Sequence, residues 1–213
     1  MRVFKAVGLM LLLFIAVYLP AFAVVGSLKP QLTIAVPLLI AITLALAAIY
    51  IALLSRRTGG FRDFGFRSGD LRYLLWAVVL ALILGLPLTW GAQQLATENP
   101  FGGAAFKPWM LALYFPFAAS IQEEVIFRGL LQTVLSRWLG DTLRLPRKIL
   151  AVPALVVAVL FGLIHARFGA FTAFSAFVLG MLAGELRQRS GSLVPSIIVH
   201  AIFNAASLLW MVV

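Results

Sequence analysis

Long apolar runs separated by short polar stretches recur along the whole sequence. Each run holds roughly 20 residues, enough for a helix to cross a hydrocarbon core of about 30 Å. Several runs contain a proline, which a membrane helix tolerates because neighbouring helices and waters satisfy the freed backbone groups. The pattern predicts seven membrane-spanning helices, at residues 5–25, 32–54, 73–90, 108–135, 149–166, 170–186 and 193–213.

The first run also fits a cleaved signal peptide, because Arg2 and Lys5 precede an apolar stretch that ends in Ala21-Phe22-Ala23. That stretch is long for a signal peptide, so a membrane span is the preferred interpretation. Cleavage would leave six spans and the same orientation for the rest.

The composition agrees with a chain that folds in lipid. Hydrophobic residues make up 63% of the sequence and charged residues 11%, with a mean hydropathy of +1.06, far from the average of soluble domains. The expected fold is all-α, a polytopic membrane helix bundle that forms one integral membrane domain over residues 1–213. The chain has no cysteine, which excludes disulfides and a thiol nucleophile.

The basic residues are distributed unevenly over the loops that seven spans create. Only Lys29, Lys107 and Arg167 fall on one side. Since basic loops stay in the cytoplasm, we expect a cytoplasmic N-terminus and an external C-terminus, in a prokaryotic cytoplasmic membrane. The net charge of +10 then suits anionic lipid headgroups, and no nucleic-acid partner is expected. The opposite loops hold Arg2, Lys5, Arg56, Arg57, Arg62, Arg67, Arg72, Arg137, Arg144, Arg147, Lys148, Arg187 and Arg189.

The fourth run carries polar residues in a regular order. Ser120, Glu124, Arg128, Gln132 and Ser136 follow one another at intervals of four, so on a helix they form one polar stripe facing away from lipid. Glu124 and Arg128 are placed to pair, with the acid on the favourable N-terminal side. An ionised side chain near the bilayer centre costs at least about 2.5 kcal/mol, which makes such residues candidates for function.

The remaining polar candidates are Glu123 and the chain's two histidines. Glu123 lies about 100° around the helix from Glu124, outside the predicted pair, and is the carboxylate left to react. His165 ends the fifth span, one turn after Phe161, and His200 lies in the seventh span, one turn before Asn204. A lone membrane histidine is more often an interhelical hydrogen-bond partner than a catalyst. Several polar groups together are harder to explain by packing alone.

These residues suit hydrolysis by an activated water. No serine lies in a G-x-S-x-G context and no thiol exists, so covalent catalysis has no obvious nucleophile. Glu123 can take a proton from water as a general base, and His165 can hold the same water. His200 and Asn204 present donors on one helix face that suit a developing oxyanion.

The same residues carry a resemblance to a known family. The stretch from Glu123 to Arg128 resembles the E-E-x-x-x-R motif of the CPBP family, which includes CAAX-type proteases and bacteriocin-processing enzymes. Phe161 to His165 resembles its F-x-x-x-H motif, and His200 to Asn204 its H-x-x-x-N motif. The similarity covers about residues 115–213, and the first three spans match only in being apolar.

The resemblance implies an intramembrane endopeptidase whose catalytic core is residues 108–213. In it, the residue matching Glu123 activates water with help from that matching His165. The residues matching His200 and Asn204 form the oxyanion hole, while Glu124 and Arg128 support the site, with Phe161 beside them. Family members act on several kinds of membrane-associated peptide or protein, so the substrate stays open, and the sequence does not specify an oligomeric state.

Two questions remain open at this stage. No cofactor is expected, but zinc is possible, since Glu123, His165 and His200 could make a three-ligand site; against it, no H-E-x-x-H pair occurs. The second question is depth: His165 lies near the external end of its span, whereas His200 lies about 12 Å from the cytoplasmic end. Tilt, a kink at Pro153 or a water-filled cavity could bring them together.

Two other functions fit parts of the sequence. A non-catalytic scaffold or bacteriocin-immunity protein would keep the fold and bind a partner. A proton or solute transporter could use the acids and histidines as a relay, although no inverted repeat is visible.

In the sixth span, Ala176, Gly180 and Gly184 recur at intervals of four and predict close approach of another helix.

Overall fold

The computed structural model describes residues 2–29, 31–97, 106–139 and 151–210. The elements these residues form are helices, arranged as seven segments. Single helices make up five segments: α1 (Arg2–Leu28), α2 (Leu32–Ser55), α8 (Val152–Ile164), α9 (Ala170–Ser190) and α10 (Val194–Leu209). Short 3-10 turns lie at η1 (Phe61–Phe64) and η7 (Ala166–Phe168). This confirms the all-α prediction.

The third and fourth segments are helices with wider π-helical turns inside them. The third consists of α3 (Leu71–Leu80), η2 (Ala81–Gly85) and α4 (Leu86–Leu95). The fourth consists of α5 (Pro108–Leu113), η4 (Tyr114–Ala119), α6 (Ser120–Glu124), η5 (Val125–Gln132) and α7 (Thr133–Leu139). Pro116 lies within η4 and Pro87 just after η2. Because proline lacks an N–H and crowds the preceding turn, both positions favour a widened turn.

Five of the seven segments are long and apolar enough to cross a membrane. The fifth and seventh are shorter within the described residues, where α8 has 13 residues and α10 has 16. The predicted spans at 149–166 and 193–213 reach into residues 149–150 and 211–213, which lie outside the described residues. A helix of 13 residues covers about 20 Å, so α8 as described, from Val152 to Ile164, is shorter than a full crossing of the hydrocarbon core.

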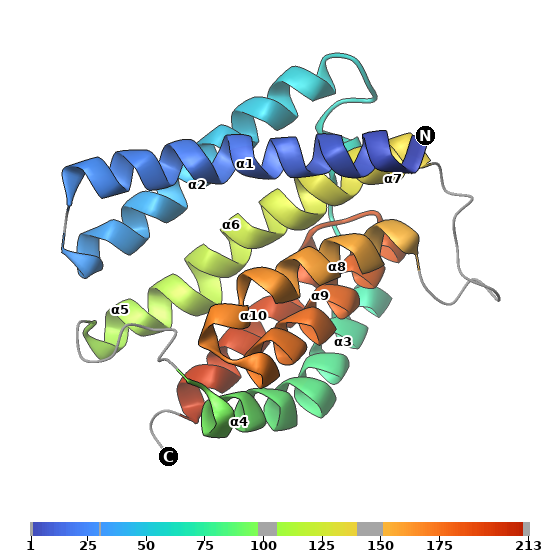
Figure 1. Cartoon of the computed structure of the whole chain (residues 1–213). Coiled ribbons are helices and arrows are strands. Elements are labelled where there is room, and N and C mark those ends of the chain that lie inside the picture. The colour runs from blue at the N-terminus through green and yellow to red at the C-terminus, as the bar shows by residue number, and fades with distance from the viewer. Residues whose placement is uncertain (1, 30, 98–105, 140–150, 211–213) are drawn as a thin grey trace.

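The fourth segment lies in the middle of the bundle. In Figure 1 it runs between the α1–α2 hairpin on one side and α3, α4 and α8–α10 on the other. The α1 and α2 helices pack against η5 and its neighbours, while α10 packs against η4 and α6. This position explains why Ile126, Phe127, Leu130 and Leu131 are buried. The central turn η5 of this segment, which carries Arg128 and Gln132 of the polar stripe, is therefore shielded from lipid.

Successive segments alternate in direction, as seven spans require. At one end, Arg67 donates to the carbonyls of Ser190 and Gly191, which joins the α2–α3 loop to the α9–α10 turn. At the other end, the backbone N–H of Thr97 donates to the carbonyl of Phe168. The loops predicted to be basic thus share one end of the bundle wherever they are described; Arg144, Arg147 and Lys148 lie outside the described residues. We call this end the basic end.

Helix α9 approaches its neighbours closely through small residues, as predicted. A Cβ atom on Gly180 would lie 3.0 Å from the Cα of Ala158, and one on Gly184 would lie 2.8 Å from the Cβ of Ala154. The close approach brings two α9 carbonyls to the polar stripe: Gly180 accepts a hydrogen bond from Arg128, and Gly184 accepts one from Gln132.

Large apolar side chains cover the outside of the bundle. Phe4, Leu19, Ile83 and Leu163 are among those that are more than half exposed. A soluble monomer rarely shows so much contiguous apolar surface, whereas lipid tails solvate it well. Together with the five long apolar helices, this surface identifies an integral membrane protein.

Candidate active site

The centre of the site is a buried ion pair on the fourth segment. Nη1 of Arg128 lies 2.8 Å from Oε1 of Glu124, and both side chains are 0% exposed. The second guanidinium nitrogen, Nη2, donates to the carbonyl of Gly180 on α9. The pair that the four-residue spacing predicts is therefore present, although the turn between its members is π-helical. Its low-dielectric surroundings make the charge-assisted bond strong and its loss costly.

His200 from α10 joins this pair at the same carboxylate oxygen of Glu124 that Arg128 contacts. Its Nδ1 lies 2.7 Å from Oε1 of Glu124, and its Nε2 lies 3.7 Å from Oε2 of Glu123. Because a carboxylate accepts, Nδ1–H is the donor, and the ring is held so that Nε2 faces Glu123. The side chain of Glu123 is 22% exposed, against 0% for Glu124. Two adjacent acids thus lie in different environments.

Phe161 lies between the two histidines. Its ring is 5.7 Å from the His200 ring and 4.7 Å from the His165 ring, measured between centroids. It also packs edge-on against Phe127 and lies under the guanidinium of Arg128. Because one phenylalanine ring contacts both imidazoles, His165 and His200 lie near each other, as the proposed common site requires. Among the described residues, no hydrogen bond or ion pair joins His165 to Glu123 or His200.

His165 caps the end of α8 and is fixed by its own helix. Its Nδ1 lies 2.7 Å from the carbonyl oxygen of Phe161, so Nδ1 carries the proton and Nε2 presents a lone pair. The ring is only partly buried. An imidazole in this tautomer can accept a proton or a hydrogen bond from water at Nε2.

Asn204 is held by the widened turn η4. Its amide nitrogen donates to the carbonyl of Phe115 at 2.9 Å and to the hydroxyl of Ser120 at 3.0 Å. The Ser120 hydroxyl donates in turn to the Phe115 carbonyl. Both amide hydrogens are therefore engaged within the protein. The assignment of Asn204 to the oxyanion hole stays a prediction, and it requires substrate to displace one of these contacts.

Polar residues of the first two spans also support the site, which the sequence did not indicate. Gln122, next to Glu123, donates to the hydroxyls of Thr43 on α2 and Tyr18 on α1. Thr43 is fully buried. The sequence did carry a weak signal for this contact, since Tyr18 and Thr43 are hydrogen-bonding residues within apolar runs. Tyrosine and threonine also occur in membrane helices without bonding to a neighbouring helix, so the signal alone did not identify the contact.

The possible zinc ligands named from the sequence, Glu123, His165 and His200, are not gathered as a metal-ligand group in the described residues, and the expectation of no cofactor stays a prediction. No group of three His, Cys, Asp or Glu in the described part of the chain is placed to hold a metal ion. Nδ1 of His200 is bonded to Glu124, and Phe161 separates this ring from His165.

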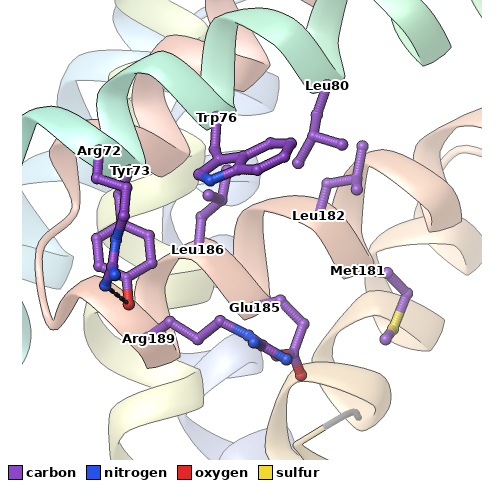
Figure 2. Close-up of a pocket in the computed structure, with 9 residues that line it drawn as sticks. All are labelled: Arg72, Tyr73, Trp76, Leu80, Met181, Leu182, Glu185, Leu186 and Arg189. Atoms are coloured by element: carbon purple, nitrogen blue, oxygen red, sulfur yellow. Dashed lines mark hydrogen bonds and ion pairs between the residues drawn. The ribbon is translucent and has the colours of Figure 1, made fainter.

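A large groove lies elsewhere on the molecule. It has a volume of about 500 Å³ and runs between α3 and α9, where Figure 2 shows Trp76, Leu80 and Leu182 along its wall. Arg72 and Arg189 lie nearer the basic end. The described residues that line this groove include none of the predicted site residues. The one carboxylate among them, Glu185, is paired with Arg189.

Comparison with known proteins supports a protease function for the chain. Residues 105–206 match the model of the family described as type II CAAX prenyl endopeptidase, Rce1-like. The matched range contains all three motifs, and the match confirms the resemblance to the CPBP family. Searches of curated proteins and of solved structures found no match. Endopeptidase activity within the membrane is the general function that this family supports.

Proposed function

Since residues 105–206 carry the similarity to the CAAX endopeptidases, we propose that this chain hydrolyses a peptide bond with a water activated by Glu123. The observation that carries the proposal is the contrast between the two adjacent acids. Glu124 is buried between Arg128 and His200, while Glu123 is partly exposed and 3.7 Å from Nε2 of His200. That separation is too long for a hydrogen bond and short enough for one water to contact both groups.

The charges of the cluster favour proton transfer at Glu123. Two carboxylates and one guanidinium leave one net negative charge, which favours transfer of a proton from the attacking water to Glu123. The resulting hydroxide attacks the scissile carbonyl carbon. The proton then passes to the leaving amine nitrogen as the C–N bond breaks.

The other polar groups complete the reaction. His165 accepts a hydrogen bond from the attacking water at Nε2, since its Nδ1 is committed to the Phe161 carbonyl. His200 stabilises the oxyanion when Nε2 carries the proton, with Glu124 holding its other nitrogen. Asn204 becomes the second donor once substrate displaces its contact with Ser120. No step in this scheme requires a metal ion.

The substrate we propose is a membrane-associated peptide. The name of the matched family points to a prenylated C-terminal CAAX-type peptide as the first substrate to test. The second is a transmembrane or leader peptide without a lipid group. With the basic loops in the cytoplasm, the N-terminus is cytoplasmic and the C-terminus external.

The test is cleavage of these two peptide types by purified protein in proteoliposomes. Glu123→Gln removes the base but keeps the shape of the side chain, and we expect the rate to fall by about 100- to 10,000-fold. Glu185→Gln is the matched control, because Glu185 pairs with Arg189 outside the cluster. Cleavage by Glu123→Gln at the rate of the control would contradict the proposal.

A further inference from the structure

A polar cavity opens at the basic end and reaches the stripe of the fourth segment. It has a volume of about 220 Å³. Its outer part includes Asp63 and Arg137, an ion pair whose side chains are 43% and 30% exposed. Its inner end is Arg128, which is fully buried and bonded to Glu124. The cavity is lined by Asp63, Arg128, Gln132, Thr133, Ser136, Arg137, Arg187 and Gln188.

Unpartnered polar atoms follow the stripe from this cavity to the active site. Four buried atoms at successive stripe positions have no hydrogen-bond partner among the described residues. They are Oγ of Ser136, Oε1 of Gln132, Nε of Arg128 and Oε2 of Glu124. Nε of Arg187, which also lines the cavity, is a fifth. One such atom alone costs about 1–3 kcal/mol, so a row of them indicates an occupant that satisfies them together.

The chemistry of these atoms identifies the occupant as water. Arg128 and Arg187 offer N–H donors, whereas Gln132 and Glu124 offer acceptor oxygens and Ser136 offers both. An anion would satisfy the donors only, and a cation the acceptors only. Water satisfies both. A volume of about 220 Å³ is room for several water molecules, each of which takes about 30 Å³ in the liquid.

The spacing along the helix suits a chain of waters. Positions four residues apart lie about 6 Å apart along an α-helix axis and closer together along the wider π-helical turn η5, and one water with two hydrogen bonds of about 2.8 Å bridges such a distance. From Ser136 to Glu124 the stripe covers at most about 18 Å. The stripe ends at the carboxylate of Glu124, which holds the imidazole of His200. That imidazole in turn faces Glu123.

We propose that this cavity and stripe form the path by which the water consumed in hydrolysis enters from the basic end. The inference rests on the proposed function, because a hydrolase in the membrane needs water delivered to its centre. The hydrocarbon core holds almost no water to hydrogen-bond with, and the outer face of the bundle is apolar. Ser136 and Gln132 are positioning residues here: they hold the waters that pass to the site.

The first test measures water access without any need for activity. Because the chain has no cysteine, single cysteines can be introduced without a background thiol. We expect Ser136→Cys and Gln132→Cys to react with silver ions added on the side of the basic loops. Leu135→Cys and Leu131→Cys are the matched controls, since these neighbouring side chains are fully buried in the apolar core. Equal reactivity of path and control positions would overturn the path.

The second test asks whether the path serves the reaction. Threonine and valine at position 136 have almost the same shape, but only threonine keeps the hydroxyl. We expect kcat of Ser136→Val to be about three- to tenfold below that of Ser136→Thr, with equal KM, as for loss of one hydrogen bond. Equal kcat values would show that the cavity does not supply the reaction. Failure of the proposed function is recognised separately, by cleavage in Glu123→Gln, which leaves the silver reactivity unaffected.

Discussion

Replacing Glu124 with glutamine removes the carboxylate that Arg128 and His200 share. Arg128 is 0% exposed and 2.8 Å from this carboxylate, and its other described hydrogen bond goes to the neutral carbonyl of Gly180. The variant leaves a buried guanidinium without its hydrogen-bonded counter-charge, and breaking a buried pair in this way costs about 3–5 kcal/mol. The expected decrease in the folding equilibrium constant is roughly 100-fold or more.

A double-mutant cycle separates this charge effect from a loss of packing. Adding Arg128→Met to Glu124→Gln removes the unpaired cation, so we expect the double variant to regain at least half of the lost free energy of unfolding. Its cleavage activity stays low, because His200 has still lost the carboxylate that orients it. The assay is reversible unfolding in mixed micelles, monitored together with peptide cleavage.

The matched control is the pair formed by Glu185 and Arg189, which has the same spacing of four residues but is partly exposed. Disrupting it with Glu185→Gln is expected to cost less than about 1 kcal/mol. A Glu124→Gln variant as stable as this control would refute the reasoning, and so would a double variant no more stable than Glu124→Gln alone.

Three further outcomes are expected. Gly184→Ala brings a Cβ to 2.8 Å from the Cβ of Ala154 and should lower the free energy of unfolding by about 1–3 kcal/mol. The control Gly8→Ala, whose new Cβ would have nothing within 4 Å, should not lower it. Equal losses of stability in the two variants would contradict the close approach of α9 to α8. Metal chelators should leave the cleavage rate unchanged, and a loss that added zinc reverses would disprove the metal-free scheme. Asn204→Ala should lower kcat by about 100- to 1,000-fold if it donates to the oxyanion, whereas an unchanged kcat would limit Asn204 to holding Ser120.

The pattern of the chain was sufficient to predict the bundle and the ion pair at its centre. Apolar runs of membrane length specify helices because lipid allows little else, and intervals of four specify one helix face. The pairing of Glu124 with Arg128 and the exclusion of Glu123 from that pair follow from this local geometry. Such local rules do not depend on how the helices are arranged.

Contacts between distant segments could not be predicted in the same way. The position of Phe161 between His165 and His200 depends on how α8 and α10 cross, which no periodicity specifies. The engagement of Asn204 by Phe115 depends on the widened turn η4, for which Pro116 was the only local signal. The unpartnered atoms of the stripe became visible only once the neighbouring helices were in place.

The central claim is that two adjacent acids have separate tasks, one in chemistry and one in structure. The most direct measurement compares Glu123→Gln with the unmodified protein for cleavage rate and free energy of unfolding on the same preparation. The account predicts that cleavage falls at least about 100-fold while stability stays within about 1 kcal/mol, because the Glu123 side chain makes no ion pair shorter than 3.7 Å among the described residues. Retained cleavage, or a loss of stability as large as that of Glu124→Gln, would contradict it.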